Sequence, residues 1–212
     1  KNPLTPIQLT IDRIKEKYTR QIDNSEKDNF AENLKIINNQ IKQIGNLVDE
    51  FSDFARMPKP VLKKNDLISI IKDNIKLLSE IDNSIRLNLT SKKSTISLQS
   101  DREQINRVIF NLIKNSIESI QQKAENTSNF DKIIDIEIYE KSNQIYIIII
   151  DNGLGFENFT SDLNEILKPY VTTKKNGTGL GLSIVNKIIN DHNGRLNFFS
   201  IPNGAKVEII FN

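Results

Sequence analysis

The chain has 212 residues, of which 29 are Lys or Arg and 27 are Asp or Glu, and its formal net charge of +2 at pH 7 gives no reason to expect a nucleic acid partner. It has no cysteine, which excludes a disulfide framework, and its longest wholly apolar run, 145–150, is far too short to span a bilayer. No signal peptide precedes that run, so the composition predicts a soluble cytoplasmic piece with room for one full domain and a helical hairpin.

Apolar residues at spacings of three and four predict two long helices at the start of the chain. They run from Leu4 to Tyr18 and from Leu34 to Ala55, with a polar turn at 21–29 between them. Pro58 and Pro60 end the second helix. Because a hairpin of two helices encloses little core, we expect it to pair with a second copy in a four-helix bundle. The alternative is a hairpin that docks on the rest of its own chain.

These signals divide the chain into three parts. Residues 1–57 are expected to form the dimerising helical hairpin, residues 58–61 a linker, and residues 62–212 a second domain of helices and strands. In that domain the patterns predict helices at 67–81 and 162–167, strands at 85–90, 95–98, 133–139, 144–151, 195–200 and 205–211, and a polar loop at 121–132.

An amphipathic helix that begins after Asp101 carries a pair of asparagines. Asn111 and Asn115 are four residues apart, so they share a face of the helix and can point at one ligand. An amide oxygen is a suitable ligand for Mg²⁺, which takes its remaining ligands from water and nucleotide phosphates. The alternative is two surface asparagines in an Asn-rich protein.

The apolar strand at 144–151 ends on a carboxylate beside two glycines. Asp151 is followed by Asn152, Gly153, Leu154 and Gly155, so one acceptor lies next to backbone without side-chain bulk. A carboxylate can accept the N6 amine of adenine, and glycines let a flat ring pack on the backbone. The alternative is a strand followed by an ordinary glycine turn.

A second glycine-rich stretch, 177–182, leads into an apolar-periodic helix at 183–192. Its glycines, at alternate positions, fit neither the Rossmann fingerprint nor the Walker loop. Alternate glycines that open a helix can still present N–H groups to a phosphate, although a tight turn explains the run equally well on its own.

In this order, the paired-Asn helix, the Asp-x-Gly-x-Gly strand end and the glycine loop resemble the N, G1 and G2 boxes of the histidine-kinase ATP-binding domain. Residues 167–174 resemble the F box of that family, with Tyr170 where phenylalanine is usual. The resemblance implies an α+β chain, in which the dimerising hairpin precedes a Bergerat (GHKL) α/β sandwich with a mixed sheet covered on one face by helices.

The resemblance also implies the cofactors and their residues. Asp151 would accept a hydrogen bond from adenine, Asn115 would hold Mg²⁺, and Asn111 and Lys174 would be the catalytic groups. The full set implied for ATP binding is Asn111, Asn115, Asp151, Gly153, Gly155, Thr173, Lys174, Gly177, Thr178, Gly179, Leu180, Gly181 and Leu182.

One position favours kinase over ATPase chemistry. DNA gyrase, MutL and related ATPases carry a glutamate one turn before the metal-binding asparagine, where it activates water, and this chain has Asn111 there. An amide cannot take a proton from water at neutral pH, so we expect poor hydrolysis and a γ-phosphate kept for another nucleophile.

The first residues, 1–6, resemble the end of the family's H box. The phosphoacceptor histidine would lie three residues before Lys1 and is absent, while Asn2 matches a position associated with phosphatase activity toward the response regulator. His192 is the one histidine, and its place before Asn193 and Gly194 indicates a structural helix end and not a phosphorylation site. The chain is therefore expected to start just past its acceptor histidine.

Residues 47–60 further resemble the second dimerisation helix of NtrY-type nitrogen-regulatory sensor kinases. This implies a homodimer that moves the γ-phosphate of Mg-ATP to a histidine, by hinging about residues 57–61, and then to an aspartate in a response regulator receiver domain. It also implies a parent protein tethered to the bacterial inner membrane through upstream segments. Two alternatives stay open: a GHKL-type ATPase, and a truncated, non-catalytic dimerisation or regulator-binding (phosphatase) module.

Overall fold

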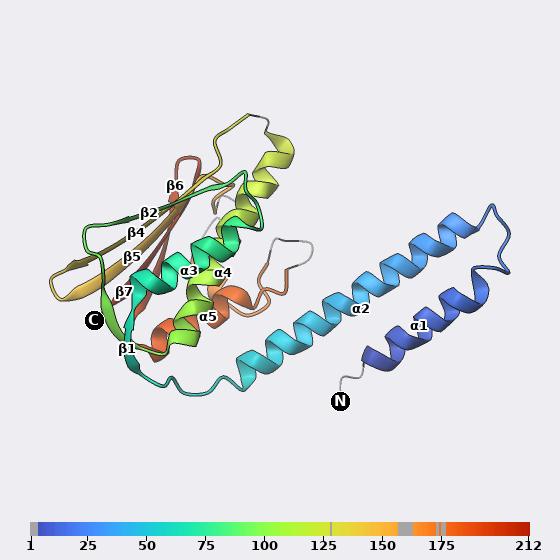
Figure 1. The fold of residues 1–212 in the computed structure, drawn as a ribbon, viewed down its shortest axis with the longest axis horizontal. Coiled ribbons are helices and arrows are strands. Elements are labelled where there is room, and N and C mark those ends of the chain that lie inside the picture. Colours follow the sequence, from blue (N-terminus) through green and yellow to red (C-terminus); the bar gives the residue numbers. More distant parts are fainter. Residues whose placement is uncertain (1–3, 128, 157–162, 173, 175–176) are drawn as a thin grey trace. The chain divides into compact units, whose positions relative to one another are not determined.

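The computed structural model describes residues 4–127, 129–156, 163–172, 174 and 177–212. The chain folds as two compact units, one made of residues 1–57 and 173–178 and the other of residues 58–172 and 179–212 (Figure 1). Among the described helices, none combines the length and the apolar character that crossing a membrane requires.

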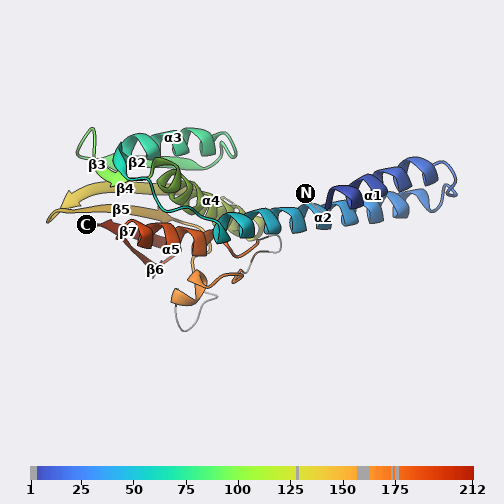
Figure 2. The same cartoon turned by 90° about the horizontal axis from the view of Figure 1, so that it is seen from below.

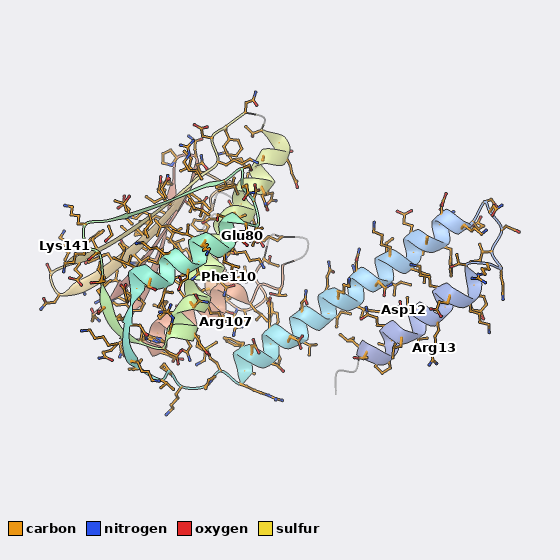
Figure 3. The ribbon with its side chains drawn as sticks, in the orientation of Figure 1. Asp12, Arg13, Glu80, Arg107, Phe110 and Lys141 are labelled. Carbon is orange, nitrogen blue, oxygen red and sulfur yellow. The ribbon has the colours of Figure 1, made fainter. Side chains whose placement is uncertain are left out.

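The first unit is the predicted helical hairpin. Helix α1 covers Leu4–Tyr18 and α2 covers Lys27–Ala55, and α1 is marked in Figure 3 by Asp12 and Arg13. Its buried core is small and consists of Ile11, Leu34 and Ile41, with Leu4 and Phe30 packed against it. Many large apolar side chains of the two helices stay exposed, namely Ile7, Leu9, Ile14, Tyr18, Ile36, Ile37, Ile44, Leu47, Val48 and Phe51.

The second unit is built on a mixed sheet, as predicted. Within the described residues its five strands lie in the order β2-β4-β5-β7-β6, with β2 parallel to β4 and the remaining neighbours antiparallel. Alternating side chains of β4 and β7 are buried, and β5 is buried along most of its length, as its isoleucine run requires. The bounds are β2 Arg86–Ser91, β4 Ile133–Lys141, β5 Gln144–Asp151, β6 Arg195–Ile201 and β7 Gly204–Phe211.

Three helices cover one face of this sheet, which confirms the predicted sandwich (Figure 2). Helix α3 (Leu67–Ser79) contacts β2, α4 (Arg102–Asn126) contacts β5 and β4, and α5 (Gly181–Asp191) contacts β6. Their apolar faces and the inner face of the sheet form one core that includes Ile71, Leu78, Ile109, Ile113, Ile136, Ile149, Val185 and Phe211. Helix α4, in the centre, therefore lies over the strand that ends at Asp151.

The sequence patterns missed a small second sheet. Strand β1 (Lys63–Asp66) pairs antiparallel with β3 (Ser97–Ser100), which begins two residues later than the predicted strand 95–98. The sequence of β1 is entirely polar, so it has no alternation that could predict a strand. Asp66 ends β1 and caps α3, because its Oδ1 accepts a hydrogen bond from the Ile68 N–H at 3.1 Å. The same oxygen accepts from the Ile96 N–H, just before β3, at 3.1 Å.

The predicted loop at 121–132 is wrong over its first half, because α4 continues to Asn126. These last turns carry polar side chains that bind neighbouring segments: Gln121 Nε2, for example, donates to Asp82 Oδ2 at 2.9 Å. A polar helical turn gives no apolar period, and tertiary contacts hold it. In the predicted short helix a 3₁₀ turn covers Leu163–Leu167, and α5 begins at Gly181, two residues before the expected start.

Candidate functional site

Helix α4 positions the candidate site. Asp101 caps its first turn by accepting hydrogen bonds from the N–H groups of Glu103 and Gln104 at 3.1 and 3.2 Å, and the apolar face of the helix is buried against the sheet. The course of α4 is marked in Figure 3 by Arg107 and Phe110. Asn111 and Asn115 lie one turn apart on α4, and both side chains are half-buried. A ligand can therefore reach their amides.

Asp151 is a buried carboxylate with two fixed donors. Its side chain is 5% exposed, its Oδ2 accepts from Ser116 Oγ at 2.9 Å, and its Oδ1 accepts from the Gly153 N–H at 3.0 Å. Burial raises the pKa of Asp151 above the ordinary value of 3.8, and these donors, the Ala205 backbone and the Lys123 charge offset part of that rise. Each carboxylate oxygen keeps a lone pair, so the group can accept a further hydrogen bond from a ligand amine.

Gly153 and Gly155 are required by close backbone approach. A Cβ added to Gly153 would lie 2.3 Å from Ser119 Oγ and 2.9 Å from the Ile120 nitrogen of α4. Gly155 has φ +71°, and a Cβ there would lie 2.5 Å from the Gly204 carbonyl oxygen. Gly153 therefore lets the Asp-x-Gly-x-Gly turn lie directly on α4, and Gly155 lets the same turn approach the backbone of Gly204.

Side chains of α4 also fasten this turn. Ser119 Oγ accepts from the Leu154 N–H at 3.0 Å. Lys123 Nζ donates to the carbonyl oxygens of Asn152 at 2.7 Å and Gly153 at 3.2 Å, and it lies 5.1 Å from the centre of the Phe130 ring.

Sequence reasoning missed these fastening residues. Asn111, Asn115, Ser119 and Lys123 form a row at intervals of four, in which Ser119 lay within the predicted helix and Lys123 lay in the predicted loop.

The second glycine motif begins α5 beside a strained tyrosine. Gly179 has φ +70° and Tyr170 has φ +68°, and the Tyr170 N–H donates to the Gly179 carbonyl oxygen at 3.0 Å. A Cβ on Gly179 would lie 2.5 Å from the Tyr170 backbone, so only glycine fits there. Leu180, the N-cap residue of α5, is fully buried, which fixes the helix start at Gly181.

The start of α5 lies next to the asparagine row of α4. A Cβ added to Gly181 would be 3.8 Å from Asn111 Oδ1, so that amide lies beside the start of α5 and its N–H groups. A hydrated Mg²⁺ with phosphates fits this chemistry, because amide oxygens suit the metal and helix N–H groups suit the anion.

The second unit thus brings together most of the predicted site residues, namely Asn111, Asn115, Asp151, Gly153, Gly155, Gly179, Leu180, Gly181 and Leu182. Lys174, Gly177 and Thr178 group with the first unit, so they are not among the residues that the second unit gathers. Asn2 and Thr173 lie outside the described residues.

His192 has the structural role expected of it. Its ring is buried at the end of α5, and its Nε2 accepts from the Asp101 N–H at 3.0 Å. The neutral ring therefore carries its hydrogen on Nδ1, which donates to the Ile188 carbonyl oxygen at 2.8 Å. Both ring nitrogens are engaged within the fold.

Two families match the chain. Residues 100–212 match the histidine kinase-, DNA gyrase B- and HSP90-like ATPase family, and residues 1–60 match the His Kinase A (phospho-acceptor) domain.

Named relatives agree with these matches. The nitrogen regulation protein NtrY of Azorhizobium caulinodans is 35% identical over 96% of this chain and 26% of its own length. An NtrY-like sensor histidine kinase of Rickettsia prowazekii is 35% identical over 100% of this chain and 34% of its own length. The chain therefore spans about a third or less of these relatives.

Solved structures share the fold. The catalytic domain of histidine kinase ThkA is 25% identical, with a TM-score of 0.60 over 71% of this chain and 94% of that one. A crystal structure of ThkA in complex with response regulator protein TrrA matches with a TM-score of 0.69 at 20% identity, over 97% of this chain and 57% of that one.

Proposed function

The chain belongs to the family of histidine kinase-, DNA gyrase B- and HSP90-like ATPases, and from that membership we propose that it binds Mg-ATP and donates the γ-phosphate to a histidine. Its phospho-acceptor domain match and its NtrY-like relatives identify it as the catalytic region of an NtrY-like two-component sensor histidine kinase. The observation that carries the proposal is the buried Asp151 carboxylate, which Ser116 of α4 binds and which two close-packed glycines follow.

Adenine binds at the end of β5 in this proposal. Asp151 accepts the N6 amine, and the ring lies on the backbone of the turn that contains Gly153 and Gly155. Ser116 and the Gly153 N–H keep the carboxylate oriented before the ligand arrives, which lowers the cost of binding.

The triphosphate extends from there toward the start of α5. The backbone N–H groups at Gly179–Leu182 face the phosphates in this proposal, and Asn115 holds the Mg²⁺ with Asn111 beside it. Mg²⁺, when bound, neutralises the charge that develops on the transferring phosphate. The family resemblance assigns further phosphate contacts to Thr173, Lys174, Gly177 and Thr178, and these stay predictions.

The proposed reaction is in-line phosphoryl transfer. A neutral imidazole nitrogen forms a bond to the γ-phosphorus as the bond from that phosphorus to the bridging oxygen breaks, and the electron pair leaves with ADP. Asn111 offers an amide where a related ATPase has a carboxylate, so it orients groups without taking a proton from water. The γ-phosphate is therefore protected from hydrolysis until the histidine arrives.

The partners follow from the first unit. Ten large apolar side chains of α1 and α2 are exposed, from Ile7 to Phe51, and a second copy of the hairpin would cover them in a four-helix bundle. We propose a homodimer on this surface, with a response regulator receiver domain as the phosphate acceptor, in keeping with the crystal structure of ThkA in complex with response regulator protein TrrA. We further propose that the parent protein is membrane-tethered and that this region is cytoplasmic.

The test follows the γ-phosphate of labelled Mg-ATP. Labelled Mg-ATP is given to this chain and, in parallel, to a version extended upstream through the expected acceptor histidine. We expect acid-labile, base-stable label on the extended protein alone, together with slow release of free phosphate. Rapid phosphate release from both proteins without label would make the chain a GHKL-type ATPase, and partner binding without either reaction would make it a non-catalytic module.

A further inference from the structure

The segment that follows the hairpin is bound to the ATP-binding unit by its backbone. Gln104 Nε2 donates to the Pro58 carbonyl oxygen at 3.0 Å, and the Val61 N–H donates to Asp101 Oδ2 at 2.9 Å. Both side chains belong to the start of α4, and we name these two hydrogen bonds the linker anchor. Strand β1 continues the attachment from Lys63 by pairing with β3.

The anchor is itself held in place. Asp101 Oδ1 caps α4, while the Asp101 N–H donates to the buried His192 at the end of α5. Burial acts to raise the pKa of the Asp101 carboxyl, but the N–H donors of Val61, Gln104 and Glu103 hold the pKa below 3.8. The carboxylate is therefore charged at neutral pH, and charge-assisted hydrogen bonds are stronger than neutral ones.

Little free chain remains upstream of the anchor. Helix α2 ends at Ala55, and the Arg56 N–H still donates to the Ser52 carbonyl oxygen at 3.0 Å. Only Arg56 and Met57 then separate the helix from the anchored Pro58. The sequence predicts a hinge over residues 57–61, which is longer than the two residues that separate the helix from the anchor.

We propose that Asp101 and Gln104 are positioning residues for phosphoryl transfer, because they hold residues 58–61 on the ATP-binding unit and confine the pivot to Arg56 and Met57. This inference rests on the proposed kinase function. Release of the anchor would add four mobile residues, or about 13 Å of extended chain, to the joint. A longer joint lowers the effective concentration of the γ-phosphate at the acceptor histidine without changing how ATP is bound.

Two variants each remove one bond of the linker anchor without removing the α4 cap. Gln104→Leu deletes the donor to Pro58 and keeps a side chain of similar size, and Val61→Pro deletes the N–H that Asp101 accepts. Val61 is 63% exposed, so its replacement disturbs no core. Lys59→Ala is the matched control, because Lys59 is an exposed residue of the same linker and makes neither of the two anchor bonds.

The first readout is amide hydrogen exchange at Val61, measured by NMR in the unaltered chain, Gln104→Leu and Lys59→Ala. Because the anchor bonds support one another, we expect Gln104→Leu to raise the exchange rate by about tenfold or more, and Lys59→Ala to leave it unchanged. An unchanged rate in Gln104→Leu would mean that the anchor does not hold the linker in solution, whatever the protein catalyses.

The second readout is phosphoryl transfer in the version extended through the acceptor histidine. We expect Gln104→Leu and Val61→Pro to lower kcat by roughly threefold or more while the KM for ATP stays within about twofold. Faster exchange with unchanged kcat would overturn the positioning role, and so would a parallel rise in KM, which would place the damage at the nucleotide site. Absence of label from the unaltered extended protein would refute the kinase proposal itself, while the exchange result would still stand.

Discussion

Replacement of Asp151 by Asn separates adenine recognition from folding. The substitution keeps the size of the side chain and one acceptor oxygen, but it puts an NH₂ donor where the second carboxylate oxygen was. The bound adenine amine then loses a charged acceptor, which costs about 1.5–3 kcal/mol, or about ten- to 150-fold in the Kd for ATP. Calorimetric titration of Mg-ATP measures this loss directly.

The effect on stability has two opposing parts. One of the two donors to Asp151, the Ser116 hydroxyl or the Gly153 N–H, loses its acceptor, at a cost of about 1–3 kcal/mol if it stays buried and unpaired. Against this, Asp151→Asn removes a buried charge. Because burial raises the pKa of Asp151 in the folded state, the folded protein binds this proton more readily than the unfolded chain, and the wild-type loses stability as pH rises through that window.

The pH dependence therefore has a definite sign. We expect the unfolding free energy of Asp151→Asn, relative to wild-type, to rise from the ordinary pKa of 3.8 up to the raised folded-state value and then to level off. Denaturant unfolding at a series of pH values tests this, with the exposed Glu137→Gln on β4 as a control that changes the same charge. A difference that falls with pH, or an unchanged Kd for ATP, would refute the reasoning.

Three further changes test other parts of the structure. Gly153→Ala would place a Cβ 2.3 Å from Ser119 Oγ, so thermal or denaturant unfolding should show a loss of about 1–3 kcal/mol. Gly45→Ala, within α2, would place its Cβ in ordinary contact 3.5 Å from Leu4 Cδ1 and should gain about 0.5–1 kcal/mol, so equal effects would contradict the close packing at Gly153. Lys123→Met should weaken ATP binding by about three- to tenfold in the same titration, because the turn loses its donor, and full affinity would remove Lys123 from the site. Phe51→Lys should shift the protein toward monomer in sedimentation equilibrium, and an unchanged mass would place the dimer surface elsewhere.

Periodic and local features of this fold could be predicted from the sequence. Helix α4 was visible because its apolar residues repeat at helical spacing, and β5 because its isoleucines form an unbroken apolar run. Asp151, Gly153 and Gly155 could be found because their motif is contiguous, and the structure gives each glycine a steric reason. The adenine role of Asp151 and the metal role of Asn115 remain predictions.

Features held by distant polar contacts could not be predicted. Strand β1 is entirely polar and exists because it pairs with β3, and the last turns of α4 carry no apolar repeat. Lys123 binds a turn 29 residues away, and Asp101 binds Val61 40 residues before it. A single sequence contains no signal for such pairs until the elements that bring them together are known.

The most direct test is a residue-resolved NMR titration of the chain with Mg-ATP and, separately, with Mg-CTP, which lacks the adenine ring. Binding at the site described above predicts amide shifts at Gly153, Leu154 and Gly181 with Mg-ATP, and loss of the shifts at the first two with Mg-CTP. Shifts confined to the polar pocket lined by residues 83–86 and 130–132, or no shifts, would contradict a nucleotide site between α4, β5 and α5.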